Sequence, residues 1–287
     1  MKKQTWIPQG ILIKPKKKSW SKTHCMLPTP LRISDKKFRI FYACRNKNNQ
    51  SCVTYSDIEF DHNLKVTKNS SSRSLLKGSL GCFDDNGVLP SSIIKINKTF
   101  YLYYIGWQPR VTTRYSLIAG LSYSKDGKNF KKFQHFPILK SNEKEKISIL
   151  TAPFVLKVKN NFMMWYVSGI KWINKDTPTY DIKLSLSSDG KNWLQTKKTC
   201  IKLKKGERAV ARPFVQYDNN KFQMWYSYEN RVGSYKIGYA ESLDGFNWKR
   251  KDQLVHFSKK EKLASAMREY SVVLNFKKET FLLYNGD

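Results

Sequence analysis

The protein has 287 residues, of which 40% are hydrophobic and 14% aromatic, and its formal net charge is +31. It contains no stretch of 18 apolar residues, which excludes a hydrophobic membrane-spanning helix, and its basic N-terminal segment lacks the apolar region of a secretory signal. The five cysteines (Cys25, Cys44, Cys52, Cys82 and Cys200) are odd in number and show no C-x-x-C spacing, so we expect free thiols in the reducing cytoplasm, no metal site and no cofactor.

The high positive charge is compatible with three anionic partners: nucleic acid, an anionic membrane surface or a phosphorylated substrate. Lysines are scattered along the whole chain, and the only dense cluster is residues 14–18 with Lys22. This distribution favours solvated surface lysines. No helix-turn-helix, RRM or zinc-finger pattern occurs, so we expect no specific nucleic-acid partner. Peripheral contact with an anionic membrane stays open.

Strand-like segments recur along the chain in groups. The first group is 31–33, 39–43 and 52–55; the second is 91–96, 100–105 and 117–122; the third is 152–158, 162–168 and 182–187; the fourth is 212–216, 222–228 and 236–240; the fifth is 269–275 and 280–284. Alternating apolar residues and β-forming side chains indicate strands in each segment. In the third group, Trp193 is predicted to begin a short fourth strand.

The groups share a motif order. Each aromatic second segment contains a tyrosine (Tyr42, Tyr104, Tyr166, Tyr226), and a proline stands 13 or 14 residues before it (Pro28, Pro90, Pro153, Pro213). Three groups end in Asp-Gly-x-x-aromatic, at Asp126, Asp189 and Asp244, where glycine accepts the positive φ of a tight turn. A period of about 60 residues indicates one supersecondary unit used several times.

Four antiparallel strands per repeat are typical of a propeller blade. We therefore predict an all-β chain with one domain, a five-bladed β-propeller with blades at about 24–80, 84–140, 148–203, 207–257 and 265–287. The last blade is incomplete at the C-terminus, and we expect residues 6–13 to pair with it. The aromatic residues Trp165 and Trp225 are predicted to lie in the core between neighbouring blades.

This geometry predicts where a site lies, because the first strand of each blade begins, and the second ends, at the same face. The side chains there converge around one central mouth. The candidate catalytic carboxylates are Asp84, Asp85, Glu207, Glu229 and Glu269, and the candidate binding residues are His24, Arg45, Trp107, Trp172, Arg212, Tyr228 and Arg268. Carboxylates can act as acid and base at a glycosidic bond, aromatic rings can stack on sugars, and arginines hold carboxylate or phosphate groups.

Among these candidates, Asp85 (or its neighbour Asp84) and Glu207 are the predicted principal pair, with Glu229 and Glu269 as secondary candidates. Trp107 is the predicted stacking platform. The arginines predict an anionic group on the ligand. The alternative is structural: glutamates and arginines at adjacent blade starts could pair with one another, and His24 alone is better explained by a structural role.

The chain resembles the five-bladed β-propeller glycosidases, the superfamily of arabinanases, β-xylosidases, invertases, levansucrases and mannoside phosphorylases. Within it, the chain is similar to the glycosidase-like proteins of bacterial surface-polysaccharide gene clusters. The resemblance is carried by residues 41–45 (FYACR), 83–91 (FDDNGVLPS), 101–107 (YLYYIGW), 164–169 (MWYVSG), 211–213 (ARP) and 224–228 (MWYSY).

The resemblance implies a substrate pocket at the propeller axis with three acidic residues, near which Asp84, Asp85 and Glu207 fall. The hydrolases of the superfamily place an aspartate at the start of the first inner strand, where this chain has His24 and no acid. Phosphorolysis, glycosyl transfer and binding without catalysis therefore stand beside hydrolysis.

We therefore expect a carbohydrate-active enzyme acting at a glycosidic bond in bacterial polysaccharide or glycoconjugate metabolism. Its expected partner is a carbohydrate, a sugar phosphate or a nucleotide sugar. The alternative is a propeller that binds a glycan or sugar phosphate without catalysis.

Overall fold

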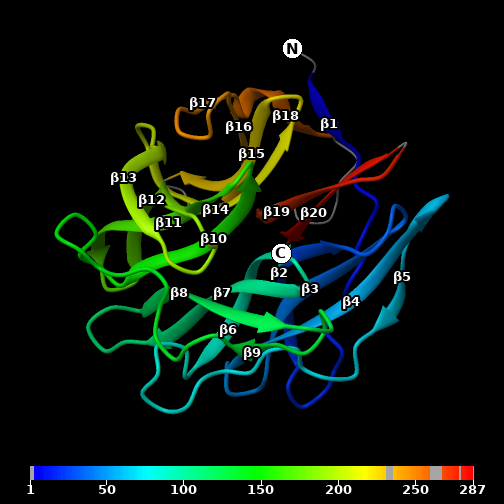
Figure 1. Cartoon of the computed structure of the whole chain (residues 1–287), viewed down its shortest axis with the longest axis horizontal. Coiled ribbons are helices and arrows are strands. Elements are labelled where there is room, and N and C mark those ends of the chain that lie inside the picture. The colour runs from blue at the N-terminus through cyan, green and yellow to red at the C-terminus, as the bar shows by residue number, and fades with distance from the viewer. Residues whose placement is uncertain (1–2, 231–234, 259–266, 278, 287) are drawn as a thin grey trace.

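The computed structural model describes residues 3–230, 235–258, 267–277 and 279–286. In these ranges the chain is built almost entirely from β-strands, with a single 3-10 turn at Asp252–Leu254 (Figure 1). The expected all-β class is confirmed. The described residues include no helix that is long and apolar enough to cross a membrane.

Four antiparallel units of four strands follow one another along the chain. The first is β2 (Thr23–Arg32), β3 (Lys37–Arg45), β4 (Ser51–Asp61) and β5 (Asn63–Asn69), and the second is β6 (Gly87–Ile96), β7 (Thr99–Pro109), β8 (Tyr115–Ser124) and β9 (Lys131–Lys132). The third is β10 (Ile149–Val158), β11 (Asn161–Asn174), β12 (Thr177–Ser187) and β13 (Leu194–Ile201), and the fourth is β14 (Glu207–Asp218), β15 (Lys221–Asn230), β16 (Tyr235–Ser242) and β17 (Lys249–Arg250).

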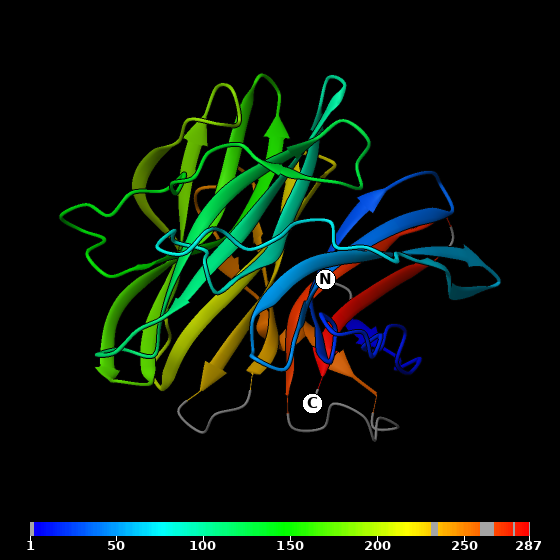
Figure 2. The ribbon, with the colours of Figure 1, turned by 90° about the horizontal axis from the view of Figure 1, so that it is seen from below.

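Two further strand pairs complete the described chain. The strands β19 (Arg268–Asn275) and β20 (Thr280–Gly286) form an antiparallel hairpin. The strand β1 (Gln4–Trp6) pairs in parallel with β18 (Val255–Phe257). Figure 2 shows the red β19–β20 hairpin beside the blue strands of the first unit, consistent with contacts of β19 and β20 with β2.

The first strands of the units lie together at the centre of the molecule. The strands β2, β6, β10, β14 and β19 each contact the next, and β19 contacts β2. Neighbouring units are also joined by short parallel pairings of β4 with β6, β8 with β10 and β12 with β14. Side chains at the starts of these central strands are thereby brought to one end of the molecule.

Each central strand is interrupted by a bulge at the equivalent point. The register shifts fall between Met26 and Thr29, Pro90 and Ser92, Thr151 and Phe154, Ala211 and Phe214, and Glu269 and Val272. Four of the bulges contain a residue with positive φ: Leu27, Ala152, Arg212 and Tyr270. A bulge bends the strand and changes the direction in which its side chains point. The short strand predicted at 31–33 is longer in the structure because the bulge accommodates Pro28 within β2.

Each Asp-Gly turn accepts a hydrogen bond from the preceding unit. A side chain of the preceding unit donates a hydrogen bond to the glycine carbonyl of each turn: Arg39 Nη1 to Gly127 (2.9 Å), Tyr103 Oη to Gly190 (2.6 Å) and Trp165 Nε1 to Gly245 (2.9 Å). Trp165 is fully buried and packs against Phe222 and Trp248 of the fourth unit. Its predicted place between units is confirmed, whereas Trp225 donates to Gln4 of β1.

The N-terminal segment closes the molecule differently from the expectation. β1 pairs with β18, and in the described ranges neither β19 nor β20 pairs with it. Leu12 and Ile13 instead pack as side chains against a cluster that includes Leu274, Phe276 and Phe281. The segment therefore covers the last hairpin through apolar contacts and not through a shared ladder.

Candidate active site

Four tyrosines gather at the end of the molecule where the central strands begin. Tyr115 and Tyr235 are the first residues of β8 and β16, Tyr180 lies near the start of β12, and Tyr270 lies near the start of β19. The Tyr180 and Tyr235 hydroxyl groups share a hydrogen bond of 2.5 Å. Burial, followed by the charge of Glu269 and by neighbouring tyrosines, raises the pKa of Tyr270 well above the usual value. Burial, followed by Tyr180 and Tyr270, does the same for Tyr235, so these hydroxyls are neutral donors at neutral pH.

Glu269 is adjacent to this tyrosine group. Burial raises the pKa of its carboxyl group to about 7, against the opposing effect of a hydrogen bond with the Tyr270 side chain. Burial, and to a smaller extent the negative charge of Glu269, raises the pKa of Tyr180, which places the two side chains near each other. In the described ranges no cation forms an ion pair with Glu269, so its protonated form is favoured by its surroundings.

Glu229 has the opposite environment. It is buried, and Arg208 Nη2 forms an ion pair with its carboxylate. Arg208 also donates to the carbonyl of Pro178 at 2.7 Å, and its charge acts on Tyr115, Tyr180 and Tyr235. An adjacent guanidinium favours the ionised carboxylate. We call the seven residues Tyr115, Tyr180, Tyr235, Tyr270, Glu229, Glu269 and Arg208 the mouth cluster.

Arg45 lies beside the mouth cluster. Burial lowers the pKa of Arg45, and the nearby Tyr270 side chain opposes this shift. The guanidinium carbon of Arg45 is 5.4 Å from the ring centroid of Trp107, and Trp107 is fixed by a 2.9 Å hydrogen bond from Nε1 to Ser51 Oγ. Arg45 Nη1 donates to Asn49 Oδ1 at 2.9 Å, whereas the buried Nε has no partner.

Arg45 also acts electrostatically on His24, which lies at the start of the first central strand. Desolvation, followed by the charge of Arg45, lowers the pKa of His24. His24 is exposed and hydrogen-bonded to Thr23 Oγ1 at 2.8 Å. Across the described ranges no carboxylate forms an ion pair with Arg45, so this side of the mouth carries a positive charge without a counterion.

The predicted principal carboxylates are placed apart from the mouth cluster. Asp84 is buried, accepts a hydrogen bond from the Tyr104 hydroxyl at 2.9 Å and forms an ion pair with Lys132 of β9 at 2.6 Å. Glu207 receives two hydrogen bonds of 2.7 Å from Arg250 of β17. Both carboxylates therefore face the last strands of their own units, and the structure does not bring them together.

The ion pair of Asp84 is one case of a repeated structural contact. The equivalent tyrosines Tyr166 and Tyr226 donate to Glu145 and Asp252, and these carboxylates pair with Lys183 and with Lys204. In three units a buried or half-buried acid thus links the tyrosine of the aromatic strand to a basic side chain. This repetition explains Asp84 as part of the fold.

Asp85 and Arg212 also occupy places that differ from the expectation. Asp85 Oδ2 accepts a hydrogen bond from the Gly81 amide at 2.9 Å within its own loop. Arg212 is 2% exposed, and its guanidinium donates to Ser91 O and Oγ (2.6 and 2.7 Å), Pro28 O (3.1 Å) and Thr29 Oγ1 (2.9 Å). Arg212 therefore ties three central strands together, and these donors are not available to a ligand.

Three predicted binding residues remain, and only one of them borders the mouth cluster. Trp172 packs against Tyr115 with ring centroids 5.6 Å apart and so borders the mouth cluster. Tyr228 lies under the guanidinium of Arg250 at 5.6 Å, on the side of Glu207. Arg268 stacks on Phe257 at 4.5 Å.

The four tyrosines and Arg208 were not among the residues predicted from the sequence. The prediction used the places where first strands begin and second strands end, but third strands also begin at the same face. Tyr115 and Tyr235 stand directly at such starts. An aromatic residue at the start of the third strand was the signal that could have found them.

Comparisons with known proteins agree with this architecture. No family model matches the chain. It is 30% identical over 272 residues to the protein Rv1502 of Mycobacterium tuberculosis strain H37Rv, an alignment that covers 93% of this chain and 90% of the relative. The protein MT1551 of strain CDC 1551 matches with the same identity and coverage.

Solved structures of glycoside hydrolases share the fold. A structure described as a glycoside hydrolase has a TM-score of 0.69 at 18% identity, with 90% of this protein and 82% of that one covered. A thermostable family-43 glycoside hydrolase has a TM-score of 0.64 at 18% identity (91% and 83% covered). The endo-arabinase of Bacteroides thetaiotaomicron has 0.61 at 14% identity (96% and 92% covered). The chain therefore belongs to the family of Rv1502, and its fold is that of the β-propeller glycoside hydrolases of the arabinanase and family-43 type.

Proposed function

We propose that the protein is a carbohydrate-active enzyme that acts at a glycosidic bond, with the mouth cluster as its active site. The observation that carries the proposal is the contrast between two glutamates at one mouth, of which Glu229 is buried and Glu269 half-buried. Burial raises the pKa of Glu269 to about 7, whereas Arg208 forms an ion pair with Glu229. Two carboxyl groups whose environments differ in this way are suited to opposite roles in acid–base chemistry.

In this proposal Glu269 is the general acid. Its protonated carboxyl group donates to the glycosidic oxygen as the bond to the anomeric carbon breaks. Glu229, which forms an ion pair with Arg208, stabilises the positive charge that develops on the sugar or activates the acceptor. The neutral hydroxyls of Tyr180, Tyr235 and Tyr270 supply hydrogen-bond donors for the sugar hydroxyl groups.

The number of blades is also part of the proposal. We take β19 and β20 as the inner strands of a fifth, incomplete blade, which makes the molecule a five-bladed propeller. The ring of five central strands and the bulge repeated in each support this count. We also propose that the substrate enters at the axis, at the end of the molecule where the mouth cluster lies.

The ligand is proposed to carry an anionic group, as in a sugar phosphate, a nucleotide sugar or an acidic sugar. Arg45 supports this, because it has a buried unpartnered Nε and no carboxylate partner in the described ranges. The neighbouring Trp107 offers its ring for stacking. Of the three arginines predicted to hold this group, Arg45 is the one proposed for the role, because the donors of Arg212 are used within the fold. A cytoplasmic place in bacterial polysaccharide or glycoconjugate metabolism fits such a ligand.

A panel of aryl glycosides, sugar phosphates and nucleotide sugars tests the proposal. Once a turned-over substrate is found, Glu269→Gln and Glu229→Gln are each expected to lower kcat by about 100-fold or more, the usual contribution of such groups. Asp85→Asn is the matched control and should stay within about tenfold of the unaltered protein. Unchanged turnover in Glu269→Gln, or a large loss in Asp85→Asn alone, contradicts the assignment.

A second candidate is a propeller that binds a glycan or sugar phosphate without catalysis. It is favoured by His24, which stands at the start of the first central strand where no acid is present. This candidate predicts that no donor class is turned over, and that binding measured by calorimetry survives the Glu229→Gln, Glu269→Gln double substitution.

A further inference from the structure

Cys44 and Cys52 face each other across the β3–β4 hairpin. They are direct partners in the antiparallel register, and their Sγ atoms are 3.8 Å apart. Directly opposed residues in such a ladder have Cα atoms about 4.5–5.5 Å apart, which falls inside the range of about 4.4–6.8 Å that a disulfide requires. Side-chain rotation can therefore bring the two sulfur atoms into bonding distance without moving the strands.

The surroundings separate the two thiols. The hydrogen bond from Cys52 lowers the pKa of Cys44 against the opposing effect of burial, and Ser21 and the charges of Lys16 and Arg73 lower it further, whereas the same hydrogen bond and burial raise the pKa of Cys52. Lys16 is held in place by hydrogen bonds from Nζ to the carbonyls of Ser70 (2.8 Å) and Tyr55 (3.2 Å). The thiolate is the reactive form of cysteine towards oxidants.

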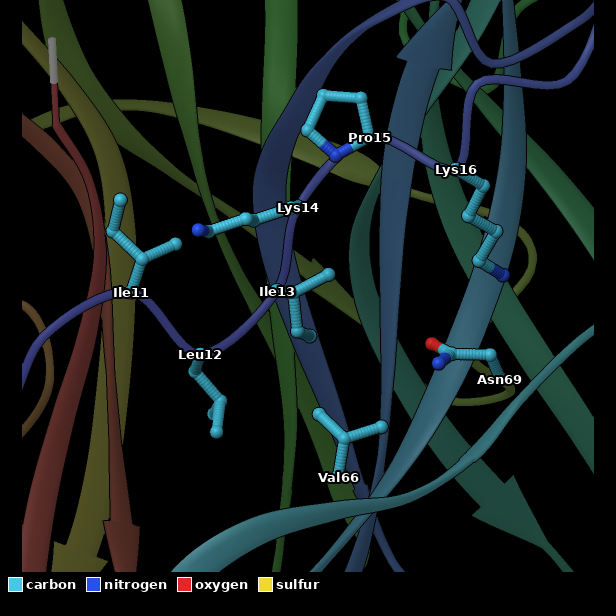
Figure 3. A pocket seen from close by; sticks show the side chains of 8 residues that line it. All are labelled: Ile11, Leu12, Ile13, Lys14, Pro15, Lys16, Val66 and Asn69. Carbon is cyan, nitrogen blue, oxygen red and sulfur yellow. The ribbon is translucent and has the colours of Figure 1, made fainter.

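Lys16 also lines a cavity. This cavity has a volume of about 380 Å³ and is lined by residues 11–16 of the N-terminal segment with Val66 and Asn69 of β5 (Figure 3). Lys16 is shared between the cavity lining and the environment of the thiols. Cys52 is 7% exposed and Cys44 fully buried, which restricts oxidation to small reagents.

We propose that Cys44 and Cys52 form a reversible oxidation site, at which a small peroxide converts the two thiols into a cross-strand disulfide. This site is independent of the proposed enzymatic activity. It goes beyond the expectation of free thiols and rests on the direct pairing of the two residues. Cys200, by contrast, directs its Sγ to the carbonyl of Gly245.

The chemistry balances with hydrogen peroxide as the oxidant. The Cys44 thiolate attacks one peroxide oxygen, the O–O bond breaks, and the leaving hydroxide takes up a proton to become water. The resulting sulfenic acid condenses with the Cys52 thiol, which releases a second water as the S–S bond forms. Two thiols are oxidised by two electrons and one peroxide is reduced to two waters. A dithiol reverses the step by thiol–disulfide exchange.

Two residues near the mouth are chain neighbours of the cysteines. Arg45 follows Cys44, and Ser51, which accepts the Trp107 indole hydrogen, precedes Cys52. A disulfide would close a short loop over residues 44–52 and restrict these two flanking positions. We therefore expect oxidation to slow hydrogen exchange in residues 45–51.

The test treats the full chain with hydrogen peroxide, blocks the remaining thiols with N-ethylmaleimide and analyses tryptic peptides by mass spectrometry. The expected product is peptide 40–45 linked to peptide 48–65, with two of the five thiols lost, and dithiothreitol should restore both. Cys44→Ser and Cys52→Ser should each abolish the linked peptide, whereas Cys200→Ser should leave it unchanged.

Other products overturn the proposal: a sulfinic acid on Cys44 without a linked peptide, a link through Cys25, or five unmodified thiols. The mapping on the unaltered chain does not depend on whether a variant folds. Circular dichroism of Cys44→Ser and Cys52→Ser shows whether their result is interpretable, and Cys52→Ala provides a second variant if the serine is not tolerated.

Discussion

The hydroxyl groups of Tyr180 and Tyr235 lie 2.5 Å apart and join the third and fourth units at the mouth of the molecule. The charge of Arg208 acts on both, and each has a further tyrosine beside it, Tyr115 for Tyr180 and Tyr270 for Tyr235. This contact defines the centre of the proposed site, because the two glutamates with contrasting environments lie around it. We therefore expect substitutions of the glutamates to alter catalysis, and substitutions of the surrounding structural contacts to alter stability.

The pH dependence of stability should reveal Glu269. Its folded pKa of about 7 is above the usual value, so its contribution to stability is fully present below the unfolded pKa and is lost as the pH rises through about 7. Glutamine does not titrate, so the Glu269→Gln variant does not lose stability in this way. The melting temperature of the variant minus that of the unaltered protein should therefore increase from about pH 5 to about pH 8. A difference that does not change with pH would show that Glu269 titrates normally.

The contact between units should depend on Trp165. Trp165→Ala removes a fully buried ring and the hydrogen bond to Gly245. We expect the free energy of unfolding, measured by urea denaturation, to fall by about 3–5 kcal/mol. Trp172→Ala is the control, since Trp172 is partly exposed, and should cost less. A loss below about 1 kcal/mol for Trp165→Ala is incompatible with its place in the core.

Arg212 should behave as a structural residue. Burial lowers its pKa to about 9, so it remains charged at neutral pH, and its donors join Ser91, Pro28 and Thr29. Arg212→Ala leaves these acceptors unsatisfied and opens a cavity, which we expect to cost about 3 kcal/mol or more of unfolding free energy. Full stability together with lost ligand binding would restore Arg212 to the ligand site.

Arg45 should control affinity for an anionic ligand without controlling stability. Arg45→Gln is expected to weaken binding of a sugar phosphate by about tenfold or more, the effect of removing one charge-assisted hydrogen bond, with little change for the dephosphorylated sugar. Replacing the exposed Lys14, Lys17 and Lys22 by glutamine is the comparison for non-specific attraction. Equal effects in titration calorimetry would assign the binding to the overall charge of +31.

The fold could be predicted from the sequence through features that act locally. The spacing of proline, tyrosine and Asp-Gly marks strands and turns, and each has a local physical cause. For the proposed site, this spacing predicted the end of the strands at which the mouth cluster lies, and Arg45 and Trp107 lie beside that cluster. It could not identify which acids face inward, because successive side chains in a strand point to opposite faces.

Adjacent residues in one strand can have their side chains in different places, which the sequence pattern does not reveal. Glu207 points to Arg250, whereas the next residue, Arg208, points to Glu229 at the mouth. The strand β19 has a bulge between Glu269 and Val272, and there Glu269 and Tyr270 interact despite being adjacent in the chain. The partners Lys132 and Arg250, which hold Asp84 and Glu207, lie on the outer strands of their units, far along the chain, as expected for a four-stranded blade.

The assignment of Glu269 as the group that protonates the leaving group is tested most directly by leaving-group dependence. The measurement compares Glu269→Gln with the unaltered protein on two glycosides of the sugar that is turned over, one with a dinitrophenyl and one with a methoxyphenyl leaving group. A dinitrophenolate departs without protonation, so its kcat should fall by less than about tenfold, while kcat for the methoxyphenyl glycoside should fall by about 100-fold or more. Equal losses on both glycosides, or no loss on either, would contradict the assignment of Glu269 as the general acid.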